Sequence, residues 1–215
     1  MASITSIYNM ALGRLRVQQT IADPDESTNL ARVCSRNYDQ CRQEVLRAFP
    51  WGCSLRAEAL AEVADQEFPG WTYVYQYPTN ALMIRAVADE GGIRSVYGAA
   101  SSYRWYNYRQ DMPRSPFQIA LKDDDGSQVI LSDVPTAWGF HTFDLENAGV
   151  YPPDLASVIA WRLAMEIGGP IQADQSAIDN AERKYYIALM NAGAQSLNES
   201  RDEVRPDSPS ISCRY

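Results

Sequence analysis

The sequence is poor in the residues that most often hold metals or carry out nucleophilic chemistry. It has a single histidine, His141, and four cysteines, no two of which form a CxxC pair. Cys34 and Cys41 are seven positions apart, which on a helix is two turns and roughly 10 Å, too far for a disulfide bond. This pattern argues against a zinc site and predicts reduced, mostly buried cysteines, as in a cytosolic protein.

Motifs of the common enzyme classes are also missing. The chain contains no GxSxG turn, no phosphate-binding loop and no GxGxxG turn. Two nearby acids, Glu58 and Glu62, with Asp65 close by, have the chemistry to hydrolyse a glycosidic bond, so a small carbohydrate-active hydrolase stays as the alternative function. Because such acidic groupings are common in any sequence, we expect a protein that is not an enzyme and that needs no cofactor or metal.

Long apolar runs and an excess of basic residues are absent as well. No run approaches the roughly 20 apolar residues of a membrane-spanning helix, and the first five residues do not begin a signal peptide. We therefore expect a soluble, non-exported chain without a membrane anchor. The formal net charge of −8 makes the chain as a whole repel nucleic-acid phosphates, and its simplest role is solubility.

What the sequence does contain is a stretch of alternating rings within residues 68–87. Trp71, Tyr73, Tyr75 and Tyr77 alternate with smaller side chains, so the pattern predicts a strand with all four rings on one side. A turn is expected at Pro78-Thr79-Asn80, followed by a second strand. The aromatic side of the first strand needs cover from the rest of the fold.

Helical spacing dominates before this stretch. Ser3 is placed to cap a short first helix, and Ser27 to cap a second helix over residues 28–49, whose apolar residues recur with a period of 3.6. The opposite face of the second helix is polar and includes Arg42. Pro50 is expected to end this helix.

Strand signals dominate the next part of the chain. Trp51 is expected to fill the core just after the second helix, and residues 53–62 favour a strand that pairs with the aromatic stretch. Residues 117–121 and 128–131, joined by a turn containing Asp-Gly, predict a hairpin. Residues 137–145 predict a further strand.

Two more helices are expected near the C-terminal end. Asp154 is placed to cap the first of them, and Gly168 to end it. The last helix has near-heptad spacing from Ile171 and is expected to end around Gly193. The short connection between the two makes them antiparallel neighbours.

These patterns predict an α+β fold. Residues 1–50 and 150–197 are expected to form a bundle of N- and C-terminal helices, residues 51–149 an inserted β-rich subdomain with antiparallel strands, and residues 198–215 an extended C-terminal tail. The tail is rich in proline, serine and charge and cannot bury itself, so it is either disordered alone or folds onto a partner.

Two segments are candidate contact surfaces. The long segment between residues 89 and 116 interleaves rings with arginines and is expected to contact a protein or pack within the fold, whereas stacking on single-stranded bases is disfavoured by the surrounding acidity. Its candidate residues are Tyr103, Trp105, Tyr106 and Tyr108. The candidate residues of the tail are Arg201, Arg205, Pro206, Ile211, Arg214 and Tyr215.

A family resemblance is carried by the order of these features. A long helix closes on a proline and a tryptophan, a tyrosine-rich Y-x-Y-P strand with a leucine and an arginine follows, and a Tyr-Pro-Pro stop precedes the last two helices. The residues are Pro50, Trp51, Tyr75, Tyr77, Pro78, Leu82, Arg85, Tyr151, Pro152 and Pro153. Over roughly residues 3–195 this layout resembles the podovirus tail tubular protein A, or head-to-tail adaptor, family.

The resemblance implies a structural virion protein in the tail or neck, assembled in the host cytoplasm. Copies of such an adaptor, typically about twelve, form a ring below the portal, continue the DNA channel and present the other face to the tail nozzle. The expected partners are therefore other copies, the portal protein and the nozzle or tube protein, while DNA passes without specific binding. Apart from the resemblance, we expect the aromatic segment to form an interface of the β subdomain or one that faces the tail, and the C-terminal tail to contact the portal or a neighbour. A phage-tail hydrolase stays as the alternative.

Overall fold

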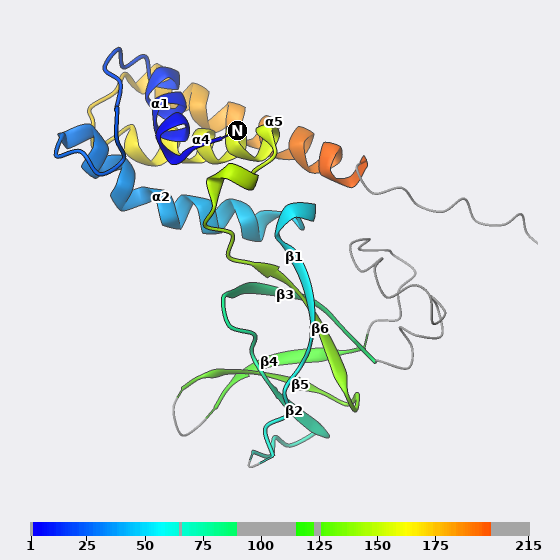
Figure 1. The fold of residues 1–215 in the computed structure, drawn as a ribbon. Coiled ribbons are helices and arrows are strands. Elements are labelled where there is room, and N and C mark those ends of the chain that lie inside the picture. Colours follow the sequence, from blue (N-terminus) through cyan, green and yellow to red (C-terminus); the bar gives the residue numbers. More distant parts are fainter. Residues whose placement is uncertain (1, 65, 90–114, 123–125, 199–215) are drawn as a thin grey trace, which may run out of the picture.

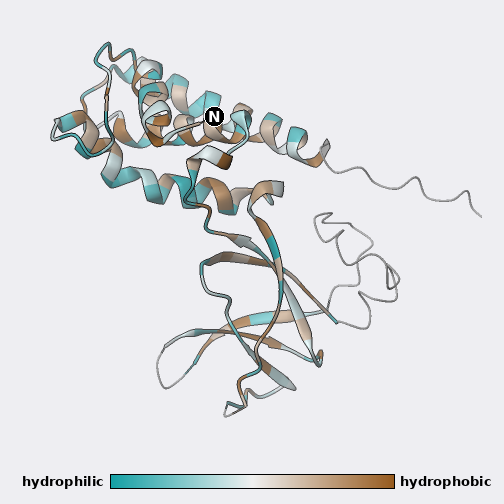
Figure 2. Ribbon diagram, viewed as in Figure 1, coloured by the Kyte–Doolittle hydropathy of each residue, from teal (hydrophilic) through white to brown (hydrophobic). Residues whose placement is uncertain are grey.

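The computed structural model describes residues 2–64, 66–89, 115–122 and 126–198. Its fold is α+β, as the sequence predicts: helices from both ends of the described chain pack together, and the strands that lie between them in sequence form two small antiparallel sheets on one side of the helices (Figure 1). The helices are α1 (Ile4–Arg14), α2 (Asn29–Ala48), α4 (Pro153–Ile167) and α5 (Gln175–Asn198), with short 3₁₀ turns η1 (Gly52–Ser54) and η2 (Ala148–Val150). Each helix carries both hydrophilic and hydrophobic residues (Figure 2), as expected of helices that bury one face.

Of the three N-cap residues predicted from the sequence, one is confirmed and two are wrong. The Ser3 side chain accepts a hydrogen bond from the backbone N–H of Ser6, which confirms the first cap. The second cap is Thr28 and not Ser27, because the hydroxyl directly before the first helical residue is the one that reaches the N–H of Ala31. Asp154 is not a cap either: α4 begins at Pro153, and Asp154 lies in its first turn.

One hydrophobic cluster joins the four helices that the structure describes. Ile7 of α1, Val45 of α2, Ile159 of α4 and Ala181 of α5 are fully buried within it. Trp51 is also part of this cluster, as predicted, and its indole N–H donates to the carbonyl of Val45 at 2.8 Å. No helix of the described residues is long and apolar enough to cross a lipid bilayer.

Helix α5 does not end at Gly193, contrary to the sequence-based expectation, but continues to Asn198. A Cβ atom at Gly193 would lie 2.9 to 3.2 Å from three ring atoms of Phe49, the residue that ends α2. One turn further on, the hydroxyl oxygen of Ser196 accepts from the backbone N–H of Gly52 at 3.3 Å. Gly193 therefore serves close packing of α5 over the end of α2, and it does not break the helix.

The six strands of the described residues form two three-stranded sheets. The first has the order β1 (Leu55–Ala59), β6 (Ala137–Phe143), β3 (Ala81–Asp89), and the second has the order β2 (Tyr73–Gln76), β5 (Gln128–Ser132), β4 (Phe117–Leu121). The β4–β5 hairpin and the strand at β6 are confirmed. The pairing predicted for residues 53–62 is wrong, because β1 pairs along its full length with the longer β6 and only the single bridge Glu62–Tyr75 reaches the aromatic strand.

The aromatic strand is covered on both faces. Tyr75 is buried, its hydroxyl donates to the carbonyl of Val134 at 2.5 Å, and its ring stacks on Tyr73 at a centroid distance of 6.2 Å. Tyr77 packs on the same cluster, whereas Trp71 packs on the opposite one, with Val74. The prediction of four rings on one side is therefore wrong for Trp71, because β2 begins only at Tyr73 and Trp71 belongs to the preceding turn.

The contact between Gly193 and Phe49 gives a testable prediction. Alanine normally stabilises a helix by about 1 kcal/mol relative to glycine, but at residue 193 its methyl group would press on the Phe49 ring. We expect Gly193→Ala to lower the free energy of unfolding by about 1–2 kcal/mol in urea titrations. In a Phe49→Ala background the same change is expected to stabilise the chain, and an unchanged sign there would contradict the packing argument.

Candidate functional site

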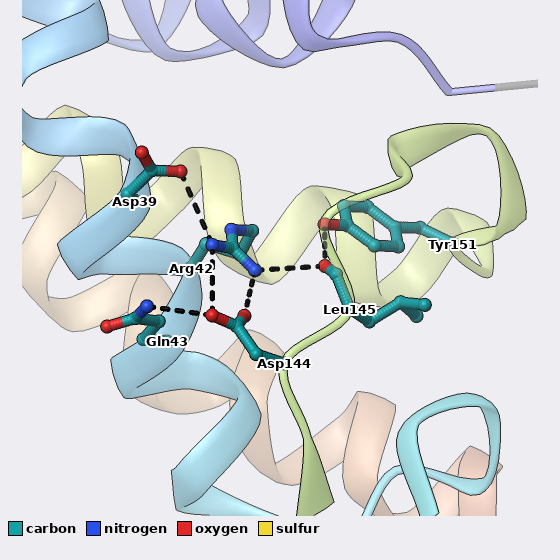
Figure 3. Close-up of polar contacts among 6 residues, drawn as sticks. All are labelled: Asp39, Arg42, Gln43, Asp144, Leu145 and Tyr151. Atoms are coloured by element: carbon teal, nitrogen blue, oxygen red, sulfur yellow. Dashed lines mark hydrogen bonds and ion pairs between the residues drawn. The ribbon is translucent and has the colours of Figure 1, made fainter. Parts of the chain in front are cut away.

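The densest polar network of the described residues lies where the helices meet the sheets. Helix α2 places Asp39, Arg42 and Gln43 on one side of a turn, since residues three and four positions apart share a helix face. Asp144 directly follows β6, and the chain then runs through Leu145 toward α4. Figure 3 shows these side chains pointing toward one another across the junction.

Arg42 is the centre of this network. Its side chain is only 3% exposed, and its guanidinium pairs with the Asp144 carboxylate, donates to the Leu145 carbonyl at 3.1 Å and lies 3.4 Å from the Asp39 carboxylate (Figure 3). The Gln43 amide donates to the same Asp144 carboxylate at 2.8 Å. The network thus joins the middle of α2 to the end of β6.

The charge state of Arg42 follows from two opposing effects. Burial alone would lower the pKa of the Arg42 guanidinium, but the hydrogen bond and the negative charge of Asp144 outweigh it, so the pKa is raised overall. Arg42 therefore stays cationic, and the pair is a buried ion pair whose partners depend on each other.

The Leu145 carbonyl accepts a second hydrogen bond. The Tyr151 hydroxyl donates to it at 2.6 Å, so this carbonyl is held by Arg42 from one side and by Tyr151 from the other (Figure 3). Burial raises the pKa of Tyr151, which keeps its hydroxyl protonated as a donor. The connection from β6 to α4 is therefore fixed against α2.

A cavity of about 420 Å³ adjoins the network. Four carboxylates line it against the one guanidinium, so its lining is acidic. The lining residues are Ile4, Tyr8, Pro24, Asp25, Ser35, Tyr38, Asp39, Arg42, Gln43, Asp144 and Glu146. Among the described residues, the wall of the cavity has neither a histidine nor a cysteine.

A second arginine joins the helices to the sheets at another point. Arg85 of β3 donates to the Thr142 hydroxyl of β6 at 2.8 Å, and to the carbonyls of Arg47 and Leu46 at 2.8 and 3.3 Å. Those carbonyls belong to the last turn of α2, which lacks further helical N–H donors. Arg85 thus caps the C-terminal end of α2 from the sheet, where a cation also favours the helix dipole.

The residues that sequence reasoning singled out lie elsewhere. All ten candidate interface residues, in the aromatic segment and in the tail, fall outside the described residues. Glu58 lies on β1 and Glu62 just beyond it; both are exposed, and neither lines the cavity described above. Asp65, the third acid of that grouping, also falls outside the described residues.

The sequence reasoning missed the Arg42 network. It assigned Arg42 to the polar face of the second helix, which is wrong, because the residue is 2% exposed. A signal was present: Arg42 lies four residues after Tyr38 and three before Val45, both on the buried stripe. Its partner could not be inferred, since Asp144 is 102 positions away.

The described residues offer little other reactive chemistry. No group of three or more His, Cys, Asp or Glu side chains among them is placed to bind a metal ion. Cys34 and Cys41 are buried, and burial raises the pKa of both thiols to about 12, whereas Cys53 is exposed. The two buried thiols are therefore inert at neutral pH.

His141 lies in the centre of the first sheet, between Arg56 of β1 and Ile84 of β3, and is 1% exposed. Its Nδ1 atom is buried without a hydrogen-bond partner, and burial lowers the pKa of the imidazole below its usual 6.5. The residue is a neutral part of the sheet at pH 7.

No family model matches the chain, and no curated protein matches it either. The functional argument therefore depends on the sequence and on the geometry given above.

The Arg42–Asp144 pair gives the second prediction. Asp144→Ala leaves a buried guanidinium without its main partner, and we expect it to lower the free energy of unfolding by about 3–5 kcal/mol. The double change Arg42→Met, Asp144→Leu removes both charges and is expected to restore most of that loss. Urea titrations measure both.

The matched control for this prediction is Arg16→Gln. It removes an ion pair with Asp174 at 3.7 Å, in which both side chains are more than 60% exposed. We expect a change within about 0.5 kcal/mol. If Asp144→Ala were as mild as Arg16→Gln, the pair would not hold the junction.

His141 gives a prediction for pH dependence. Because the pKa of His141 is lowered in the folded chain, the unfolded chain binds more protons as pH falls below about 6.5, and stability falls with it. We expect the stability advantage of wild type over His141→Gln to shrink between about pH 7.5 and about pH 5.5 in urea titrations. A constant difference between the two proteins would show that His141 does not titrate in that window.

Proposed function

We propose that this chain is a structural virion protein, a head-to-tail adaptor similar to tail tubular protein A. The observation that carries the proposal is the layout: N- and C-terminal helices that share one core, with antiparallel sheets inserted between them. The same layout is implied by the family that the sequence resembles. Two residues of the motif lie at the junction, where Leu82 packs on the helical core and Arg85 caps α2.

The two arginine contacts hold the sheets in a fixed orientation relative to α2, which suits a protein that links two partners. Arg42 and Arg85 attach the sheets to α2 at two separate points, which resists rotation of one part against the other. Each guanidinium offers several donors in a fixed plane and so sets direction as well as distance. In the proposed ring, a portal-facing part and a tail-facing part would keep a fixed relation in every copy.

The charge of the chain suits a DNA channel. DNA passing through a ring must slide, and a net charge of −8 avoids the salt-dependent affinity that basic walls would create. In this proposal about twelve copies form the ring, between the portal protein and the tail nozzle, in the tail or neck of the virion. No observation on the described residues favours the alternative hydrolase, since Glu58 and Glu62 do not share the acidic cavity.

Electron cryomicroscopy of virions tests the proposal. We expect the α+β fold described here to fit the density of a ring between portal and tail nozzle, with one copy per symmetry position. Mass spectrometry of the same purified particles is expected to detect the chain at a matching copy number. A virion that lacks the chain, or that holds it outside this ring, would contradict the proposal.

A further inference from the structure

The outward side of α5 carries large apolar side chains that the fold leaves mostly exposed. Tyr186, Ile187, Met190 and Leu197 are 56%, 54%, 77% and 53% exposed. Together with the exposed Ala194 they form what we call the α5 seam. Most surface residues of this acidic chain are polar, so the grouping of these side chains on one helix is informative.

The α5 seam is distinct from the side of the helix that holds the fold together. Ala181, Tyr185 and Ala192 are buried and belong to the cluster shared by the four helices. The seam residues stand on the other side of the same turns. Helix α5 is therefore apolar on two sides, and only one of them is buried by the described part of the chain.

The spacing of the α5 seam indicates what kind of surface fits it. Ile187, Met190, Ala194 and Leu197 are separated by three, four and three residues, which is the spacing of a helix that packs along a second helix. Small Ala194 between larger residues leaves room for a facing side chain. This spacing favours a partner helix with the same repeat.

The lack of charge on this part of α5 further limits which partner can pack on the α5 seam. Residues 185–198 contain no charged side chain, in a chain that is 21% charged and carries a net −8. Two copies of such a chain repel each other over most of their surfaces, and a neutral helix is where they can approach. A strongly basic partner would need acidic residues on the surface that binds it, and this stretch has none.

We propose that the α5 seam packs against the α5 seam of a second copy of this chain. Because each copy offers the same surface, the contact has two-fold symmetry. The exposed area of the seam is on the order of 400 Å² per copy, about half of what a standard stable interface buries on each side, so the association is weak and depends on concentration. This pairing differs from the head-to-tail contacts of a ring and does not rest on the proposed adaptor role.

Sedimentation velocity tests the proposal. We expect the wild-type chain to change from monomer to dimer between about 1 µM and about 200 µM. Met190→Glu places a charge in the centre of the seam and is expected to weaken association at least about tenfold. The matched control is Gln195→Glu, which introduces the same negative charge at an exposed position of α5 outside the seam and is expected to leave association unchanged.

Cysteine cross-linking tests the symmetry of the contact. In a chain with Cys53 and Cys213 changed to serine, Met190→Cys is expected to form disulfide-linked dimers under mild oxidation, whereas Gln195→Cys is not. Circular dichroism and thermal unfolding check that each variant is folded, which both exposed positions should allow.

Several results would overturn the proposal. A wild-type chain that stays monomeric over the whole range would do so, as would association that Met190→Glu and Gln195→Glu affect equally. Association that appears only after removal of residues 199–215 would assign the α5 seam to the tail of the chain itself. None of these results bears on whether the chain lies in a virion ring, so the two proposals fail separately.

Discussion

The buried ion pair between Arg42 and Asp144 is the contact on which the relation between helices and sheets depends. Two charges removed from water are stable only in each other's presence, so α2 and the end of β6 cannot separate without exposing or orphaning one of them. The pair also orders what surrounds it. Arg42 holds the Leu145 carbonyl, Tyr151 holds the same carbonyl, and α4 begins two residues later. A single guanidinium thus fixes the route by which the chain returns to the helices.

Arg85 attaches the sheets to α2 at a second point. This contact is a helix cap, whereas the contact of Arg42 is an ion pair. Arg85 donates to carbonyls at the end of α2, where the helix terminus supplies both the acceptors and the negative end of a dipole. One attachment would leave the sheets free to turn about it, whereas two attachments on the same helix define a direction. Lysine could not replace either arginine equally well, since a single ammonium group cannot reach several acceptors in one plane.

The parts of this fold that sequence reasoning predicted are local, and the parts it missed depend on distant partners. Helices α1 and α2 follow from apolar spacing over neighbouring residues, and the β4–β5 hairpin follows from its turn. The partner of β1 lies some eighty residues away in β6, and no local signal distinguishes it from the aromatic strand. The permissive backbone of glycine predicts a helix end at Gly193, whereas the actual role of this residue depends on Phe49, far earlier in the chain.

The groups that the described part of the chain leaves exposed differ in kind from those that it buries or pairs. Its potentially reactive groups are mostly occupied or buried: Arg42 is paired, His141 is neutral within a sheet, and the thiols of Cys34 and Cys41 hold their protons. Its most exposed large apolar group is Met190, on the α5 seam. Exposed apolar side chains grouped on one helix are suited to contacts between molecules. The exposed side chains of the α5 seam are thus consistent with the assembly role proposed above.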